Sequence, residues 1–263
     1  MKIAKIQTHD GKSSYAMVEE TDYCLIAGDI FDGIKVTKQR IPHSAAKLLA
    51  PVQPPQVVAV GLNYRAHAKE SNMPVPSAPV VFIKTCNTVV GPGDAIVLPS
   101  MAPSEVDYEA ELVIVIGKKA KNVSETDALS YVLGYTCGND VSARDCQLRL
   151  DKQWARGKCF DTFAPIGPWI ETELDGDACD IRLVLSGQEV QHSNTSDMVF
   201  NCRQLVSYLS HCMTLYPGSI IMSGTPSGVG MGRKPPLWLK HGDTATVCIA
   251  GIGSLTNPVV KEE

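Results

Sequence analysis

The stretch VDYEAELVIVIG, Val106–Gly117, decides the predicted fold. Its second half, Leu112–Ile116, is apolar at every position, which is typical of a strand that is buried on both faces. Alternate side chains of a strand share one face, so Asp107, Glu109 and Glu111 are predicted to point the same way just before the core. Carboxylates at the end of a buried strand open into a cleft or a cavity.

The remainder of the chain is also predicted to be mostly β, because short apolar runs are separated by Gly, Pro, Asn and Asp. The expected strands of the main part are residues 57–60, 80–83, 95–98, 109–116, 129–138, 181–185, 219–222 and 245–249. The expected helices are residues 64–71, 202–213 and 124–131, the last overlapping one strand. Strands and helices do not alternate regularly, so the prediction is an α+β class with a β-rich mixed sheet rather than a doubly wound parallel sheet.

The segment Pro51–Pro55 marks the predicted domain boundary, because proline can continue neither a helix nor a strand ladder. A small N-terminal β-containing unit is expected over residues 1–52, and the main domain over residues 53–263. The N-terminal unit carries alternating segments at 2–7 and 15–19 and a helical candidate at 44–49.

The composition indicates which binding partners and which cellular compartment to expect. The 263 residues carry a formal net charge of −4 without a visible Lys/Arg cluster, which argues against nucleic-acid and anionic-membrane binding. The first ten residues lack the apolar core of a signal peptide, and no run approaches the ~18 apolar residues of a membrane span. A cytoplasmic protein is expected. Nine scattered cysteines without a C-x-x-C pair indicate free buried thiols.

The carboxylates before the apolar run admit two interpretations. Acidic residues are usually exposed, so a solvated strand face is one of them. The other is a metal site, because like charges in a cleft raise one another's pKa unless a cation neutralises them. Asp140, which ends another expected strand, is a third ligand candidate beside Glu109 and Glu111. Oxygen ligands without His or Cys favour Mg²⁺, with Mn²⁺ or Ca²⁺ as substitutes, over zinc.

His67 and Glu70 lie three residues apart on an expected short helix, where their side chains are neighbours. Such a pair is either an ordinary surface pair or an acid/base dyad, in which the glutamate orients the imidazole. Gly61 and Asn63 before the helix, with prolines after it, suit a hinged lid.

The loop SGTPSGVGMG, residues 223–232, has the glycine content of a nucleotide-binding loop but lacks the helix or the Lys-Ser/Thr ending that such a loop needs. We therefore expect a tight loop whose backbone N–H groups, Gly224 among them, and Thr225 hydroxyl hold a small carboxylate.

Taken together, these stretches resemble the fumarylacetoacetate hydrolase superfamily, in particular its domain-containing branch of acylpyruvases, oxaloacetate decarboxylases and oxaloacetate tautomerases. The resemblance covers residues 55–259, nearly the whole main domain. It rests on six motifs in one order: GLNYRAHAKE (61–70), VVGPGD (89–94), DYEAE (107–111), NDVSARD (139–145) with Gln147, GKCFDTFAPIGP (157–168) and SGTPSGVG (223–230).

The resemblance implies a role for each motif. Glu109, Glu111 and Asp140 would bind Mg²⁺ or Mn²⁺, while Asp107 lies outside the ligand pattern as a supporting group. The other implied roles are an acid/base dyad on a mobile lid (His67, Glu70), stabilisation of an enolate or oxyanion (Lys158) and binding of the carboxylate and oxo groups of the substrate (Arg144, Gln147, Thr225). A mixed β-roll with few helices and a homodimer are implied as well.

Three functional hypotheses follow for a small-molecule 2-oxo acid substrate. The first is a Mg²⁺-dependent enzyme that cleaves a C–C bond, by acylpyruvate hydrolysis or by oxaloacetate-type decarboxylation, through a stabilised enolate. The second is a keto–enol tautomerase or isomerase of oxaloacetate or a related diacid. The third, from another class, is a metal-binding scaffold without turnover.

Overall fold

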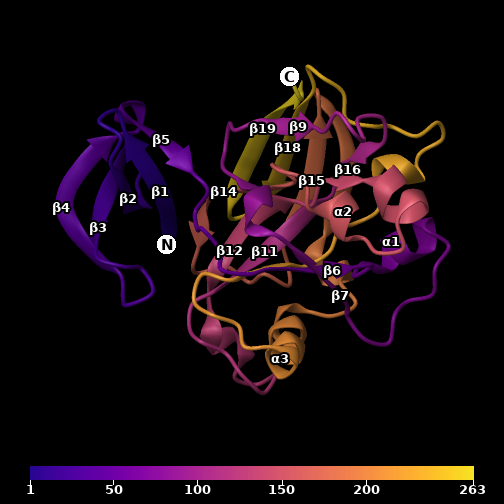
Figure 1. Cartoon of the computed structure of the whole chain (residues 1–263). Coiled ribbons are helices and arrows are strands. Elements are labelled where there is room, and N and C mark those ends of the chain that lie inside the picture. The colour runs from indigo at the N-terminus through magenta and orange to yellow at the C-terminus, as the bar shows by residue number, and fades with distance from the viewer.

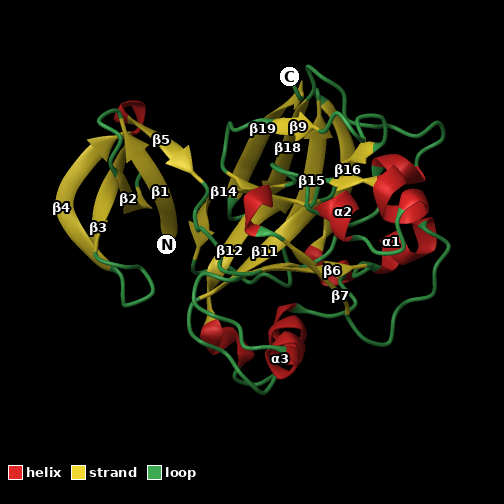
Figure 2. Cartoon of the chain, in the orientation of Figure 1, coloured by secondary structure: helices red, strands yellow, loops and turns green.

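The computed structural model describes residues 1–263. Two sheets make up most of the chain and pack against each other through β11 and β12 on one side and β15, β18 and β19 on the other (Figure 1). The α+β class with β-rich mixed sheets and few helices is confirmed. Figure 2 shows how small the helical share is.

The larger sheet runs from the N-terminal strands to the edge of the main domain. Its strands in spatial order are β4 (Lys35–Pro42), β3 (Asp22–Ala27), β2 (Ser13–Val18), β1 (Lys2–Thr8), β14 (Ala164–Glu171), β12 (Val132–Asn139), β11 (Ala110–Ile116), β17 (Ile220–Met222), β6 (Val57–Gly61) and β7 (Val80–Lys84). In addition, β5 (Ala46–Leu49) pairs with β1, and β8 (Val89–Val90) pairs with β14.

The second sheet has the order β16 (Gln188–Asn194), β15 (Asp180–Leu185), β18 (Thr244–Ile249), β19 (Gly253–Lys261) and β9 (Ile96–Leu98). A short ladder joins β10 (Val106–Asp107) to β13 (Ser142–Ala143). The α-helices are α1 (Arg65–Glu70), α2 (Ala155–Lys158) and α3 (Cys202–Cys212). Short 3-10 or π turns are η1 (His43–Ala45), η2 (Cys86–Thr88), η3 (Ala128–Tyr131), η4 (Cys146–Leu150), η5 (Thr195–Asp197) and η6 (Gly230–Gly232).

Strand β11 is the centre of the fold, as the apolar run predicted. All of its residues are buried, and it lies between β12 and β17. Leu112, Ile114 and Ile116 face the core between the two sheets, whereas Val113 and Val115 face a second core on the other side. Because both faces are covered by apolar side chains, the strand needs no polar face, which explains its continuous hydrophobicity.

The strand expected at 109–116 is confirmed as β11, which begins one residue later at Ala110, but Asp107 belongs to β10, which pairs with β13 instead of the main sheet. Two other local predictions differ from the structure. The helix expected at 44–49 is β5, which pairs with β1 after the short turn η1. The strand expected to start at 129 starts at Val132, because η3 occupies the preceding residues.

The N-terminal strands lie to one side of the main domain (Figure 1). They are nevertheless tied to it, because β1 pairs with β14 with Ile3 opposite Ile170, and Val52 packs into the core around β6 and β17. The proposed division into residues 1–52 and 53–263 stays a prediction.

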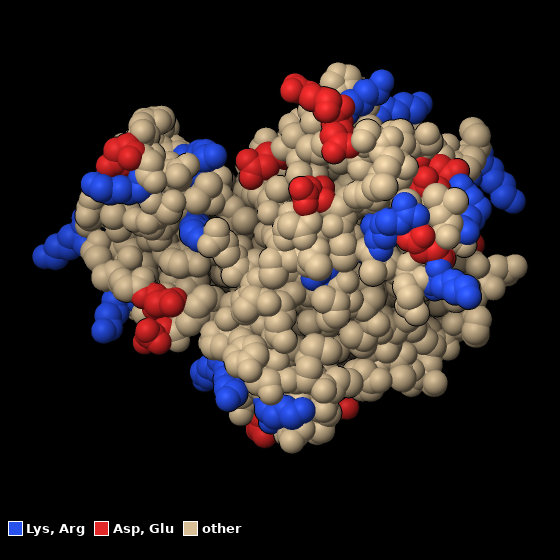
Figure 3. Space-filling view, in the orientation of Figure 1, with Lys and Arg blue, Asp and Glu red and all other residues tan.

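On the face drawn in Figure 3, Lys and Arg are interspersed with Asp and Glu and form no basic stripe. None of the helices has the length and apolar character that a membrane crossing requires. All nine cysteines are free, but Cys86 and Cys212 are exposed, contrary to the expectation of buried thiols.

Candidate active site

Three carboxylates come together where β11 and β12 pair. Glu111 lies opposite Gly138 in this ladder, Glu109 immediately precedes β11, and Asp140 immediately follows β12. Their exposed fractions are 6% for Glu109 and 1% for each of the other two. One carboxylate oxygen from each of the three residues can be chosen so that the three oxygens lie within 4.8 Å of one another. This burial excludes a solvated strand face.

Three cationic side chains contact this carboxylate cluster: Lys158, Lys84 and Arg144. Lys158 on α2 donates to Glu109 Oε2 at 2.7 Å and to Asp140 Oδ2 at 2.6 Å. Lys84, the last residue of β7, donates to Asp140 Oδ1 at 2.6 Å. Lys84 was not predicted as a site residue; its place directly after the apolar run VVFI indicates a buried lysine but not its partner. Asp140 is therefore bonded by an ammonium group on each oxygen.

The cations compensate the three carboxylates unequally. Burial would raise the pKa of Glu109, but the charges of Arg144 and Lys158 outweigh it and hold that pKa well below its usual range. The pKa of Glu111 is raised well above its usual value by burial and by the nearby carboxylates of Asp140 and Glu109. Glu111 is thus the member whose negative charge is least compensated.

The donor set fits a divalent cation. Gly224 N–H donates to Glu111 Oε2 at 2.9 Å, and no protein donor bonds Oε1. Carboxylate oxygens that already accept one hydrogen bond keep a second lone pair, so Glu109 and Asp140 retain ligand capacity. A hard cation such as Mg²⁺ prefers these oxygen ligands and would relieve the repulsion that raises the pKa of Glu111.

Arg144 and Gln147 lie beside the carboxylate cluster, on the segment after β13. Arg144 is 3% exposed and donates through Nη2 to Glu109 Oε1 at 2.7 Å, and through Nη1 to Gln147 Oε1 at 2.9 Å. Its Nε donates to Asp107 Oδ2 at 2.9 Å. The guanidinium is therefore held by groups of the chain itself, and the predicted role of Arg144 and Gln147 in substrate binding stays a prediction.

The His67–Glu70 pair is formed within α1. His67 Nδ1 lies 2.9 Å from Glu70 Oε2, and the histidine is 8% exposed, so this is no ordinary surface pair. Arg65 fixes the helix by donating to the carbonyl of Met198 at 2.7 Å. Gly228 N–H donates to the second oxygen of Glu70 at 2.8 Å. Because Nδ1 is taken by Glu70, the other ring nitrogen is the one left for chemistry.

The glycine-rich loop binds carboxylates of the chain itself. Besides the contact of Gly224 with Glu111, the Thr225 hydroxyl donates to the Ala110 carbonyl at 2.9 Å and accepts from Gln191 at 2.9 Å. This arrangement places Gly224 and Thr225 at the carboxylate cluster. Their predicted contact with a substrate stays a prediction.

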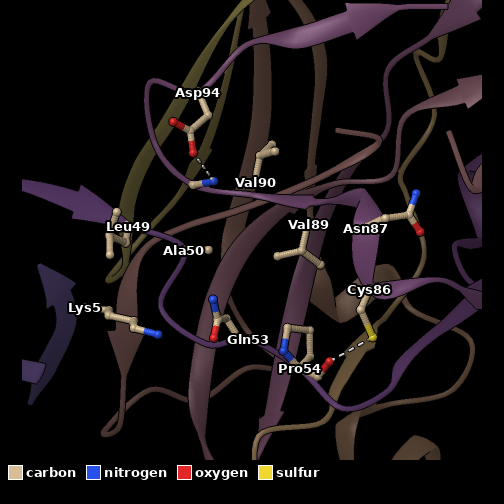
Figure 4. A pocket seen from close by; sticks show the side chains of 11 residues that line it. Lys5, Leu49, Ala50, Gln53, Pro54, Cys86, Asn87, Val89, Val90 and Asp94 are labelled. Atoms are coloured by element: carbon tan, nitrogen blue, oxygen red, sulfur yellow. Dashed lines mark hydrogen bonds between the residues drawn. The ribbon is translucent and has the colours of Figure 1, made fainter. Parts of the chain in front are cut away.

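A separate cavity of about 540 Å³ lies between the N-terminal strands and the main domain. Figure 4 shows Lys5, Leu49 and Gln53 on one side of it and Val89 and Asp94 on the other. Asp94 accepts from Gly91 N–H and is therefore already paired. The cavity contains none of the predicted site residues.

Comparison with known proteins identifies relatives over nearly the whole chain. The family model "Fumarylacetoacetate (FAA) hydrolase C-terminal" matches residues 56–260, and the model "Rv2993c-like, N-terminal" matches residues 1–51. A fumarylacetoacetate hydrolase domain-containing protein 2 homolog of Dictyostelium discoideum is 51% identical over 85% of this chain and 77% of its own length. The mitochondrial oxaloacetate tautomerase Fahd2a of Rattus norvegicus is 47% identical over 84% of this chain and 71% of its own length.

Solved structures agree with the sequence relatives. The 5-carboxymethyl-2-hydroxymuconate delta-isomerase of Mycobacterium smegmatis superposes with a TM-score of 0.91 at 41% identity, with complete coverage of both chains. The 2-hydroxyhepta-2,4-diene-1,7-dioate isomerase of Mycobacterium marinum gives a TM-score of 0.90 at 40% identity over 100% of this chain and 99% of that chain. This chain therefore belongs to the fumarylacetoacetate hydrolase family.

Proposed function

We propose that this protein is a keto–enol tautomerase of a small 2-oxo diacid, with oxaloacetate as the first substrate to test. The observation that carries the proposal is the buried His67–Glu70 pair beside a carboxylate cluster that fits a divalent cation. The names of the relatives support it, because oxaloacetate tautomerases and isomerases are prominent among them. We therefore prefer the tautomerase, the second of the hypotheses drawn from the sequence, to an enzyme that cleaves a C–C bond.

Proton transfer is assigned to His67. The Glu70 carboxylate accepts a hydrogen bond from Nδ1–H and fixes the plane of the ring, which leaves Nε2 to take a proton from C3 of the keto acid. The same nitrogen can then pass this proton to the enolate oxygen, which gives the enol, and the reverse sequence returns it to C3. Glu70 itself is fixed by Gly228 N–H, so the base is oriented before the substrate arrives.

Stabilisation of the negative charge on the 2-oxo oxygen is assigned to Lys158. Its ammonium group is buried with the carboxylate cluster. Burial lowers the pKa of Lys158, but the charges of Asp140 and Glu109 outweigh this effect and raise the pKa above its ordinary value, so the group remains cationic. A fixed cation in a site shielded from water stabilises negative charge that develops on the oxygen as the C3 proton leaves. When bound by Glu109, Glu111 and Asp140, a divalent cation would supply further positive charge for the carboxylate and oxo groups.

Cleavage of a C–C bond is the second candidate, and the same dyad favours it. A glutamate-oriented histidine can activate water for acylpyruvate hydrolysis, in which a bond to C3 breaks and pyruvate leaves. Decarboxylation of oxaloacetate would also release pyruvate. Tautomerisation releases none, so the product separates the two candidates.

The test follows enol and keto ultraviolet bands of oxaloacetate together with a coupled pyruvate assay, with Mg²⁺ and with chelator. Acetylpyruvate and fumarylpyruvate are the comparison substrates. Enol–keto conversion above the spontaneous rate, without pyruvate, supports a tautomerase. Metal-dependent pyruvate release would instead establish cleavage, and no turnover of any of the three compounds would favour the metal-binding scaffold.

A further inference from the structure

The glycine-rich loop contacts two separate parts of the site through its backbone. At one end, Gly228 N–H donates to Glu70 Oε1 at 2.8 Å. At the other, Gly230 N–H donates to Asp107 Oδ1 at 2.7 Å, and Met231 N–H donates to Asp107 Oδ2 at 3.0 Å. A single short segment therefore fixes a member of the dyad and a buried carboxylate next to the cluster.

The close fit of this segment depends on its glycines. A Cβ atom on Gly230 would lie 1.9 Å from the Leu237 carbonyl oxygen and 2.6 Å from Asp107 Oδ1. A Cβ atom on Gly232 would lie 2.9 Å from Glu70 Cδ. Only glycine lets the backbone approach both carboxylates so closely.

Asp107 extends the connection to the carboxylate cluster. It is fully buried and accepts from Arg144 Nε at 2.9 Å, and the same guanidinium donates through Nη2 to Glu109 Oε1 at 2.7 Å. A continuous set of hydrogen bonds thus runs from Glu70 through the loop, Asp107 and Arg144 to Glu109. Asp107 Oδ2 lies 2.9 Å from both Nε and Nη2 of Arg144, so the guanidinium is held by Asp107 as well as by Glu109.

We propose that Asp107 is a positioning residue that couples the His67–Glu70 helix to the cation-binding carboxylates through the glycine-rich loop. Loss of its negative charge releases Arg144, which then no longer orients Glu109, and it releases the loop, which then no longer holds Glu70. The inference rests on the proposed function only in assigning Glu109 to the cation and Glu70 to the dyad.

The test uses Asp107→Asn in the full chain. Asparagine keeps one oxygen for Gly230, but its amide nitrogen cannot accept from Met231 or Arg144. We expect Mg²⁺ affinity, measured by calorimetry, to fall by roughly 10- to 100-fold, as is typical when a group that orients a ligand is removed. We also expect faster hydrogen exchange in peptides covering residues 65–70, which Asp107 does not touch directly.

Asp243→Asn is the matched control, because Asp243 also accepts a backbone N–H within a turn, from Lys240 at 2.8 Å, but lies outside the site. It should leave both measurements unchanged. If Asp107→Asn has wild-type Mg²⁺ affinity, or wild-type exchange over 65–70, the coupling does not exist.

Should Asp107→Asn fail to fold, Gly232→Ala tests the same connection from its other end, since its methyl group displaces Glu70. Faster exchange over 65–70 accompanied by weaker Mg²⁺ binding supports the coupling, and unchanged Mg²⁺ binding overturns it. Neither measurement uses a substrate. Absence of turnover in the wild-type protein would therefore refute the proposed function and leave this inference to its own test.

Discussion

The ammonium group of Lys84 donates to Asp140 Oδ1 at 2.6 Å, and both side chains are almost completely buried. The same ammonium donates to the carbonyl of Val141 at 3.2 Å. Burial lowers the pKa of Lys84, and the charge of Asp140 opposes this shift. A buried cation with these two partners has few alternatives in the core, so it contributes to the placement of Asp140.

Lys84→Met is expected to destabilise the protein. It keeps the apolar volume of the side chain but leaves Asp140 with Lys158 as its only ammonium partner. Breaking a buried ion pair by removing one member costs about 3–5 kcal/mol, and because Lys158 still compensates part of the charge of Asp140, we expect the lower end of this range. Urea unfolding of the variant measures the change. Lys118→Met, at an exposed position, should stay within about 0.5 kcal/mol of the wild type, and an equally small effect at Lys84 would show that the pair is not needed.

Glu109→Gln is expected to abolish or strongly weaken Mg²⁺ binding. The amide offers a single neutral oxygen in place of the carboxylate, and it removes the acceptor that Lys158 and Arg144 share. Calorimetric titration with Mg²⁺ measures the loss. Glu105→Gln provides the control, since Glu105 lies four residues before Glu109 but is paired with the exposed Arg149. Equal Mg²⁺ affinity in the two variants would refute the assignment of Glu109 as a ligand.

Gly157→Ala is expected to lower turnover by displacing Lys158. A Cβ atom at this position would lie 2.8 Å from the Ala143 carbonyl oxygen and 2.8 Å from Gln147 N, so α2 must move away from the site. We expect turnover to fall by about tenfold or more, because a fixed cation that shifts stabilises the developing charge poorly. Ala155→Ser, on the exposed side of the same helix, is the control for helix substitution. Wild-type turnover of Gly157→Ala would mean that the position of Lys158 is not critical.

The central part of the fold could be predicted from the sequence because its signals are local. The apolar run of β11 and the Asp140 that follows β12 could be recognised without knowledge of distant contacts. Strand β14 was missed, since Pro165, Gly167 and Pro168 argue against a strand, and pairing with β12 and β1 overrides this local preference.

The contacts of the candidate site were only partly predictable for the same reason. Spacing brought His67 next to Glu70, and the pairing of β11 with β12 brought Glu111 next to Asp140. No sequence pattern, however, indicates that Lys84 reaches Asp140, because this contact depends on how β7 and the end of β12 meet in space.

His67→Ala is expected to abolish proton transfer while leaving the cation site intact. The histidine bonds Glu70 and none of the three carboxylates of the cluster, so Mg²⁺ affinity should remain that of the wild type. The rate of enol–keto conversion of oxaloacetate, followed by ultraviolet absorbance, should then fall to the spontaneous rate. His192→Ala is the matched control, because His192 also bonds a carboxylate, Asp180 at 2.7 Å, but its side chain is 52% exposed on a strand of the second sheet and contacts none of the site residues. Undiminished conversion by His67→Ala, with folding and Mg²⁺ binding preserved, would place the proton-transfer group on another residue.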